Sequence, residues 1–272
     1  MSFKSGFVTI VGRPNVGKST LLNRLVGEKT AITTDKPQTT RNRIQGIYND
    51  DDSQIVFLDT PGIHKPKHKL GQFMVDTATR TFNEVDLILL MVDESPEIGP
   101  GDRYILEQLE HVKTPVLLII NKLDLMEPDK FKKLYDTYAA MPFIKEVLAL
   151  SAVKDENVDP LMTRIKSYME EGPAYFPKDM VTDQPERVLV AELIREKALM
   201  YLEEEIPHGI AVEIEQMKLR PDGRIIDISA VIVCEKDSHK GIVIGKQGRK
   251  LKGIGKSARE DMEALLGTKV FL

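Results

Sequence analysis

The sequence predicts an α/β fold with a mixed, mostly parallel sheet covered by helices on both faces, followed by a smaller α+β unit. In the first part of the chain, short apolar runs alternate with helical stretches, as in parallel sheets with helical crossovers. After a proline-rich stretch the pattern changes to a helix, two alternating strands and a second long helix. We therefore expect one domain over 1–172, a linker over 173–185 and a second domain over 186–272.

Composition indicates a soluble protein with an uneven charge distribution. Hydrophobic residues make up 42% and charged residues 29% of 272, and no apolar run approaches the length of a membrane span. The first strand follows almost directly after Met1, so we expect no signal peptide and a cytoplasmic location. The net charge is -4, yet residues 236–256 carry seven Lys/Arg against one acid. Positive charge is thus concentrated near the C-terminus, which favours an anionic partner there.

A phosphate-binding motif lies at Gly12–Ser19, between an apolar strand and a helix. Its glycines, Gly12 and Gly17, allow a tight turn that aims backbone N–H groups at phosphate oxygens. Lys18 is expected to reach the β- and γ-phosphates, and Ser19 to ligate Mg²⁺. Further contacts with the nucleotide are expected from Asn15, Val16 and Thr20.

A polar loop of unusual length follows over Thr30–Arg43. Long loops in compact domains are commonly functional. A hydroxyl here could complete the Mg²⁺ shell only when a γ-phosphate is present, which would make the loop a nucleotide-dependent switch. Thr40 is the first choice for this ligand and Thr39 the second.

The runs 44–48 and 54–58 flank a turn-rich cluster and are expected to form a hairpin. The second run ends in Asp59-Thr60-Pro61-Gly62. A carboxylate at the end of a strand beside the phosphate loop can hold Mg²⁺ directly or through water, which is the role expected of Asp59. The backbone N–H of Gly62 is expected to contact the γ-phosphate.

Two polar motifs follow later strands of the predicted sheet. Further strands are expected over 86–92, 115–120 and 147–150, with helices over 102–110 and 130–139 between them. Ligands bind at the carboxyl ends of strands in such sheets. Asn121-Lys122-Leu123-Asp124 follows the second of these strands, and Ser151-Ala152 follows the third.

These two motifs indicate that the base is guanine. Guanine has adjacent N1–H and N2–H donors that the carboxylate of Asp124 can accept together, whereas adenine has no such pair. Asn121 is expected either to reach the purine or to buttress the phosphate loop. The stem of Lys122 is expected to pack along the base, and the N–H of Ala152 to meet the O6 carbonyl. An ATPase remains an alternative, which tight ATP binding would support.

The chain beyond the linker predicts a small α+β unit. A helix near 160–169 leads to three prolines within 173–185. A helix is then expected over 187–205, and alternating strands over 210–217 and 225–233. A final helix is expected to end near Leu266.

Gly245-Lys246-Gln247-Gly248 lies between two helices of this unit, within the basic segment. A Gly-x-x-Gly loop in this setting is typical of a KH domain, which clamps single-stranded RNA by its backbone. The glycines permit close approach, and Lys246, Arg249 and Lys250 supply charge. Residues 236–266 contain no Phe, Tyr or Trp, so recognition through a stacking platform is disfavoured.

Together these residues resemble the Era family of bacterial GTPases, from Gly12–Ser19 and Gln38-Thr39-Thr40-Arg41 to Val243–Gly248. The resemblance implies a P-loop GTPase domain followed by a type II KH domain, with GTP/GDP and Mg²⁺ as ligands. It also implies binding near the 3′ end of 16S ribosomal RNA, a role in 30S maturation and loose association with the inner membrane. A monomer is expected. Family members usually continue past the point where this sequence ends, so the KH domain is expected to be truncated at its C-terminus.

Hydrolysis of GTP to GDP and phosphate is expected to be slow. Ile63 follows Gly62 where a glutamine could orient water, and an isoleucine can neither orient water nor accept a proton. Asn15 either holds a K⁺ ion that replaces an arginine finger, as in related GTPases, or stabilises the loop. A different class of function also stays open: an RNA-binding assembly factor in which hydrolysis only resets the cycle.

Overall fold

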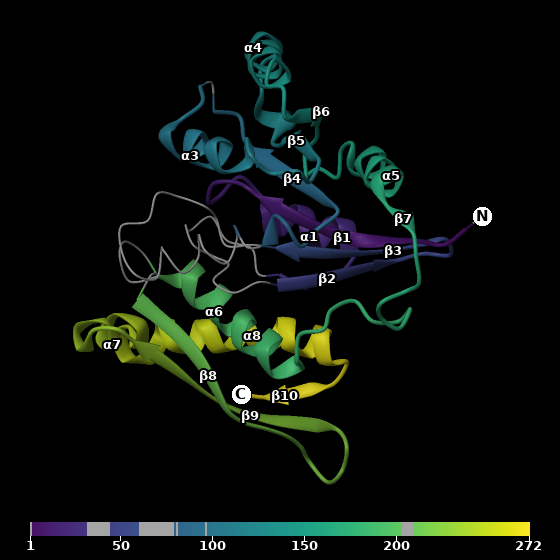
Figure 1. Ribbon diagram of the computed structural model, residues 1–272. Coiled ribbons are helices and arrows are strands. Elements are labelled where there is room, and N and C mark those ends of the chain that lie inside the picture. Colours follow the sequence, from purple (N-terminus) through teal and green to yellow (C-terminus); the bar gives the residue numbers. More distant parts are fainter. Residues whose placement is uncertain (1, 32–43, 60–78, 80, 96, 203–208) are drawn as a thin grey trace. The chain divides into compact units, whose positions relative to one another are not determined.

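A computed structural model of the protein divides into two compact units, with the boundary between Asp183 and Gln184 (Figure 1). The structure describes residues 2–31, 44–59, 79, 81–95, 97–202 and 209–272. Residues 173–183, expected as part of a linker, belong to the first unit.

Among the described residues, the first unit is built on a mixed sheet of seven strands in the order β2-β3-β1-β4-β5-β6, with β7 paired to β1. Neighbours among β1, β3, β4, β5 and β6 run parallel, whereas β2 joins β3 and β7 joins β1 in antiparallel fashion. The mostly parallel sheet and the β2–β3 hairpin are thus confirmed. The strands are β1 (Lys4–Val11), β2 (Ile44–Asn49), β3 (Ser53–Asp59), β4 (Leu87–Val92), β5 (Val116–Ile120), β6 (Ile144–Ala149) and β7 (Glu170–Glu171).

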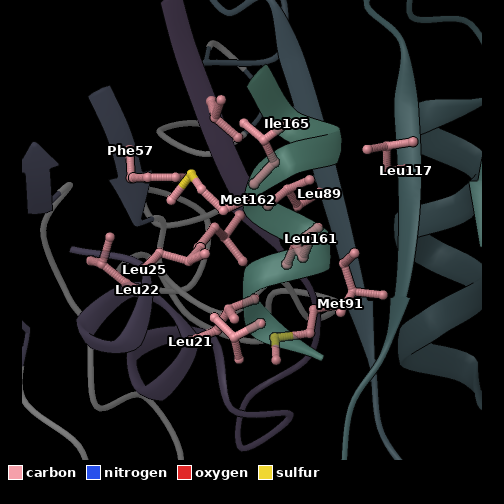
Figure 2. Packing of buried hydrophobic residues seen from close by; sticks show 14 of the residues in the cluster. Leu21, Leu22, Leu25, Phe57, Leu89, Met91, Leu117, Leu161, Met162 and Ile165 are labelled. Carbon is pink, nitrogen blue, oxygen red and sulfur yellow. The ribbon is translucent and has the colours of Figure 1, made fainter. Parts of the chain in front are cut away.

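Helices cover both faces of this sheet, with α1 and α5 on one face and α3 and α4 on the other. Side chains of the central strands alternate between two apolar clusters: Leu89 and Met91 of β4 enter the first, and Leu90 enters the second. Figure 2 shows Leu89 beside Leu161 of α5. These helices are α1 (Lys18–Val26), α3 (Pro100–Leu109), α4 (Pro128–Ala139) and α5 (Val158–Tyr168).

The parallel strands bring their carboxyl ends to one edge of the sheet. Val92 of β4 pairs with Ile120 of β5, which in turn pairs with Ala149 of β6. Val11 of β1 pairs with Leu90 of β4. The loops after these strands therefore start side by side, at the edge where α/β sheets bind ligands.

Residues 172–181, called the strap below, pack along the first unit. The fully buried side chain of Gln54 accepts the N–H groups of Tyr175 at 2.6 Å and Phe176 at 2.9 Å. It also donates to the carbonyl of Phe176 at 2.8 Å. The strap is further held by hydrogen bonds from the Ile47 N–H to the Val181 carbonyl and from Asn49 to the Met180 carbonyl, and by ring contact between Phe7 and Tyr175. The strap is therefore anchored on β1, β2 and β3.

The second unit contains a three-stranded sheet in the order β10-β9-β8, in which β8 and β9 are antiparallel and β9 and β10 parallel. The helices α6 and α8 bury apolar side chains such as Leu193 and Ile254 in one cluster with Ile228 of β9. This agrees with the predicted α+β arrangement. The elements are α6 (Glu186–Tyr201), β8 (Ile210–Leu219), β9 (Ile225–Cys234), α7 (Asp237–Ile244), α8 (Arg249–Leu266) and β10 (Lys269–Phe271).

The first helix of this unit ends at Tyr201, four residues earlier than the sequence suggested. Leu202 is already extended, with φ -107° and ψ 146°, and its side chain is buried. Apolar spacing alone predicted a longer helix because it continues through Leu202, whereas the helical backbone stops there. The remainder of the expected helix, 203–205, lies outside the described residues.

Candidate functional site

The phosphate-binding motif forms a tight loop between β1 and α1. A Cβ atom on Gly12 would lie 2.3 Å from the carbonyl oxygen of Met91, so only glycine fits there. Gly17 has φ +102°, and a Cβ atom on it would lie 2.4 Å from Nδ2 of Asn121. The ammonium of Lys18 is buried and donates to the carbonyls of Gly12 at 3.2 Å and Arg13 at 2.9 Å. The lysine ammonium is therefore held against the backbone of its own loop.

The remaining predicted residues of this loop are brought to the same place. Asn15 is exposed and has φ +66°, while Val16 is fully buried. Ser19 and Thr20 are half-buried in the first turn of α1, at the positive end of the helix dipole. The arrangement offers backbone N–H groups and a lysine to an anion.

Asn121 joins the phosphate loop to the loop after β6. Its Nδ2 donates to the carbonyl of Val16 at 2.8 Å, and its Oδ1 accepts the N–H of Ala152 at 3.0 Å. Of the two roles open for Asn121, the structure contains the buttress of the phosphate loop. The N–H of Ala152, expected to meet a base carbonyl, donates to Asn121 here. Both groups are buried, so this link fixes the two loops relative to each other.

Asp124 lies exposed at the same edge and is oriented by Ser151. The Ser151 hydroxyl donates to Oδ1 of Asp124 at 2.6 Å, and the Leu123 N–H donates to the carbonyl of Leu150 at 3.1 Å. The preceding Lys122 adopts φ +63°, which starts the short 3₁₀ turn η1 (Leu123–Leu125). The two predicted base motifs therefore meet, with a carboxylate available to accept paired N–H donors.

Several predicted residues fall outside what can be described. Thr39, Thr40, Gly62 and Ile63 lie outside the described residues, and for Asp59 only the backbone at the end of β3 is described. Within the described part of the chain, no group of three His, Cys, Asp or Glu residues is arranged to hold a metal ion.

A charged cluster beside the phosphate loop was missed by sequence reasoning. Arg13 donates to Asp93 at 2.8 Å and to Asp102 at 2.7 Å, and Lys122 lies 3.6 Å from Asp93. Burial alone would lower the pKa of Arg13, but the Asp102 and Asp93 carboxylates outweigh it and raise that pKa. These residues come from four separate segments, and the nucleotide motifs leave Arg13 and both aspartates unspecified, so no sequence signal could have grouped them.

In the second unit, the Gly-x-x-Gly loop forms a tight turn between α7 and α8. Gly245 and Gly248 have φ +71° and +72°, and Gln247 between them has φ +55°. A Cβ atom on Gly245 would lie 2.6 Å from Cβ of Lys250. The side chains of Lys246 and Arg249 are exposed, so the turn presents backbone and positive charge together.

A groove of about 1330 Å³ runs from this turn along α8 and β9. Its walls include apolar side chains such as Ile228, Val243 and Ile254. Arg249, which was predicted to contact RNA, forms a basic stripe on α8 with Lys252, Lys256 and Arg259, which were not, and this stripe also lines the groove. Spacings of three or four residues place these cations on one helix face, a signal that the predicted helix already contained. Phe271, an exposed aromatic of β10, lines the groove as well.

No helix among the described residues is long and apolar enough to cross a membrane.

Comparison with known proteins covers both units. The family model described as a 50S ribosome-binding GTPase matches residues 7–122, and that described as a KH domain matches residues 205–272. GTPase Era of Clostridioides difficile is 64% identical over 271 residues, covering 99% of this chain and 91% of that protein. GTPase Era of Alkaliphilus metalliredigens is 61% identical over 272 residues, covering 100% of this chain and 92% of that protein.

Two crystal structures resemble the chain along its length, each with a TM-score of 0.95, 42% identity and coverage of 99% of this chain and 92% of the other. One is Era in complex with MgGDPNP and nucleotides 1506–1542 of 16S ribosomal RNA. The other is an Aquifex aeolicus Era variant bound to GDP and AlF₄⁻.

Proposed function

Because the chain belongs to the Era family of GTPases, we propose that it is a slow GTP-controlled switch that binds 16S ribosomal RNA near its 3′ end and assists 30S subunit assembly. The observation that carries the proposal is the pairing of a phosphate loop and two base motifs in one unit with a basic Gly-x-x-Gly groove in the other. We assign the protein to the cytoplasm as a monomer. The family resemblance adds loose association with the inner face of the cell membrane.

GTP is assigned to the edge of the sheet where the loops after β1, β5 and β6 meet. The backbone of Gly12–Ser19 and the ammonium of Lys18 would hold the phosphates. Asp124, oriented by Ser151 at 2.6 Å, would accept the two N–H donors of guanine. Asn121 would act indirectly, by holding the phosphate loop through the carbonyl of Val16.

Mg²⁺ is assigned to Ser19, with Thr40 and Asp59 as further ligands. Hydroxyl and carboxylate oxygens are the hard donors that Mg²⁺ prefers, and Ser19 lies in the first turn of α1 beside Lys18. When bound, the ion would neutralise charge on the β- and γ-phosphates. Gly62 would contribute a backbone N–H to the γ-phosphate. Because Ile63 supplies no group to orient water, we assign slow hydrolysis and a K⁺ ion held by Asn15.

RNA is assigned to the groove between the Gly-x-x-Gly turn, α8 and β9. Gly245, Gln247 and Gly248 would admit the sugar-phosphate backbone closely, while Lys246, Arg249 and Lys250 would neutralise phosphates. The family model described as a 50S ribosome-binding GTPase covers only residues 7–122, which do not include the groove. The choice of 16S RNA instead follows the Era complex that matches both units and contains that RNA.

Crosslinking of the full chain to total cellular RNA, with GDP or with a non-hydrolysable GTP analogue, tests the proposal. We expect 16S RNA near its 3′ end to be enriched, with a yield that depends on the nucleotide. The matched control replaces Lys246 and Arg249 by glutamine, which should remove the enrichment and leave nucleotide binding intact. Absence of ribosomal RNA in both nucleotide states would overturn the partner.

Single-turnover hydrolysis with and without that RNA separates two classes of function. Strong stimulation by RNA would support a switch coupled to assembly. Fast hydrolysis that ignores RNA would instead indicate an independent hydrolase, and would contradict the slow turnover assigned here.

A further inference from the structure

One carboxylate, that of Asp93, touches cations from both halves of the nucleotide site. It follows β4 directly, and its Oδ1 accepts a guanidinium N–H from Arg13 of the phosphate loop at 2.8 Å. Its Oδ2 lies 3.6 Å from the ammonium of Lys122, which belongs to the base motif. The Ser95 hydroxyl also donates to Oδ1 at 2.6 Å. The side chain of Asp93 is only 11% exposed, so solvent screens these contacts weakly.

Arg13 has a second anchor in Asp102, in the first turn of α3. Nε of Arg13 donates to Oδ1 of Asp102 at 2.7 Å, while Nη2 donates to Oδ1 of Asp93. A planar guanidinium can reach two carboxylates at once in this way, whereas a lysine ammonium is a point charge on a flexible stem. The side chain passes closely over Gly101, where a Cβ atom would lie 2.8 Å from Cδ of Arg13. The start of the phosphate loop is therefore tied to both β4 and α3.

The cluster brings two cations against two buried carboxylates, and Glu94 adds a third, more exposed carboxylate 3.1 Å from Lys122. Burial alone would raise the pKa of Asp93, but the Ser95 hydroxyl, Arg13 and Lys122 outweigh it and lower that pKa. Asp93 is therefore ionised at neutral pH. Removal of one member of a buried pair leaves an uncompensated charge, so the members depend strongly on one another.

We propose that Asp93 is a positioning residue that couples the phosphate loop to the guanine motif, so that binding of the phosphates and binding of the base strengthen each other. Movement of Arg13 changes the electrostatic field on Asp93 and with it the position of Lys122, whose stem the sequence predicts to pack along the base. This coupling is separate from the link that Asn121 makes, because no atom is shared between them. The inference rests on the proposed assignment of the nucleotide to this edge of the sheet.

A double-mutant cycle on GDP affinity tests the coupling in the full chain. Arg13→Lys keeps the charge but cannot serve both carboxylates, and Lys122→Met removes the other cation. We expect each change to weaken GDP binding, and the loss in the double variant to be at least about threefold smaller than the product of the single losses. In an Asp93→Asn background the two losses should multiply. Single losses in affinity that simply multiply in the double variant of the otherwise wild-type chain overturn the proposal, even if Asp93→Asn fails to fold.

Glu94 provides the matched control. Its carboxylate lies 3.1 Å from the ammonium of Lys122, whereas Arg13 pairs with Asp93 and Asp102. The coupling should therefore survive Glu94→Gln, and its disappearance there would assign the effect to general charge around Lys122. Coupling that persists in Asp93→Asn would also overturn the proposal. Failure of the wild-type chain to bind GDP at all would instead overturn the nucleotide site itself.

Discussion

The side-chain amide of Gln54 holds the backbone of Phe176 from two sides, accepting its N–H at 2.9 Å and donating to its carbonyl at 2.8 Å. The same oxygen accepts the N–H of Tyr175, and the same nitrogen donates to Asn49 at 2.7 Å. The side chain that makes these hydrogen bonds has no exposed surface. A sequence stretch that looks like a free tether is thus fixed to the sheet through one glutamine.

Gln54→Leu is expected to destabilise the first unit by about 2–4 kcal/mol, because it leaves three partly buried backbone groups of the strap without their partner. Amide hydrogen exchange at Tyr175 and Phe176 should accelerate more than exchange in α5. Gln108→Leu on α3, where the glutamine is half-buried, is the control and should change the free energy of unfolding by less than about 0.5 kcal/mol. Unchanged exchange at both strap amides would contradict the anchoring role.

Gln54 also illustrates what the sequence could not predict. Its place in a hairpin followed from local β-branched runs and turn residues, but its partner lies 122 residues away and is backbone. A side chain that binds backbone imposes no residue type on its partner. The strap was therefore recognisable only by its prolines, which predicted a linker. The same applies to Asp93 and Arg13, which lie 80 residues apart at positions that nucleotide motifs leave open.

Features that depend on local backbone conformation, in contrast, could be predicted from the sequence. Gly12 and Gly17 are required by close approach or positive φ, and the alternating apolar strands required helices on both faces. Residues with such constraints stand out in a single sequence. Of the two roles left open for Asn121, the sequence could not select one, because a hydrogen bond to the backbone carbonyl of Val16 requires no particular residue type there.

Asp124→Asn should change the base specificity of the nucleotide site from guanine to xanthine. The asparagine loses one of two charge-assisted acceptor sites for guanine, but its NH₂ can donate to the 2-carbonyl of xanthine. We expect GTP affinity to fall by roughly 10³-fold and xanthosine triphosphate to bind more tightly than GTP. Competition titrations measure both. Asp129→Asn, an exposed residue of α4, should leave the preference unchanged. Retained guanine preference in Asp124→Asn would place the base elsewhere.

Hydrolysis is expected to be faster in K⁺ than in Na⁺ buffer, by about tenfold, because a positioned cation stabilises charge that develops in the transition state. Asn15→Gly should remove this difference. Glycine accepts the φ of +66° found at Asn15, so the change deletes the side chain without straining the loop. GDP affinity measured alongside reports whether the loop is intact. Equal turnover of the wild-type chain in the two salts would refute the K⁺ assignment.

The hairpin between β2 and β3 should lose stability in acid through Asp50. Burial alone would raise the pKa of Asp50, but hydrogen bonds from Lys166, Ser53 and Tyr48 outweigh it and hold the pKa well below its ordinary value of 3.8. A lowered pKa in the folded state means that the stabilisation is complete above pH 3.8 and disappears as the pH falls further.

Urea unfolding at pH 6 and at pH 2.5 should therefore show a stability difference between wild type and Asp50→Asn that shrinks by about 1–2 kcal/mol in acid. Asp51→Asn is the control, because that neighbouring side chain is exposed. A difference that is independent of pH would show that the ionised form of Asp50 contributes nothing to the fold.

The basic stripe on α8 should contribute to RNA affinity in proportion to the phosphates that it neutralises. Each phosphate contact on single-stranded RNA contributes about 0.7 to the slope of log affinity against log salt. Replacement of Lys252 and Lys256 by glutamine should therefore reduce the slope by about 1.4 for the 16S RNA 3′ segment, with little change in unfolding. Lys269→Gln is the control, because this exposed lysine pairs with Glu263 at 2.9 Å and does not line the groove. An unchanged slope in the double variant would confine the RNA to the Gly-x-x-Gly turn, whereas an equal effect at Lys269 would indicate diffuse attraction to the whole unit.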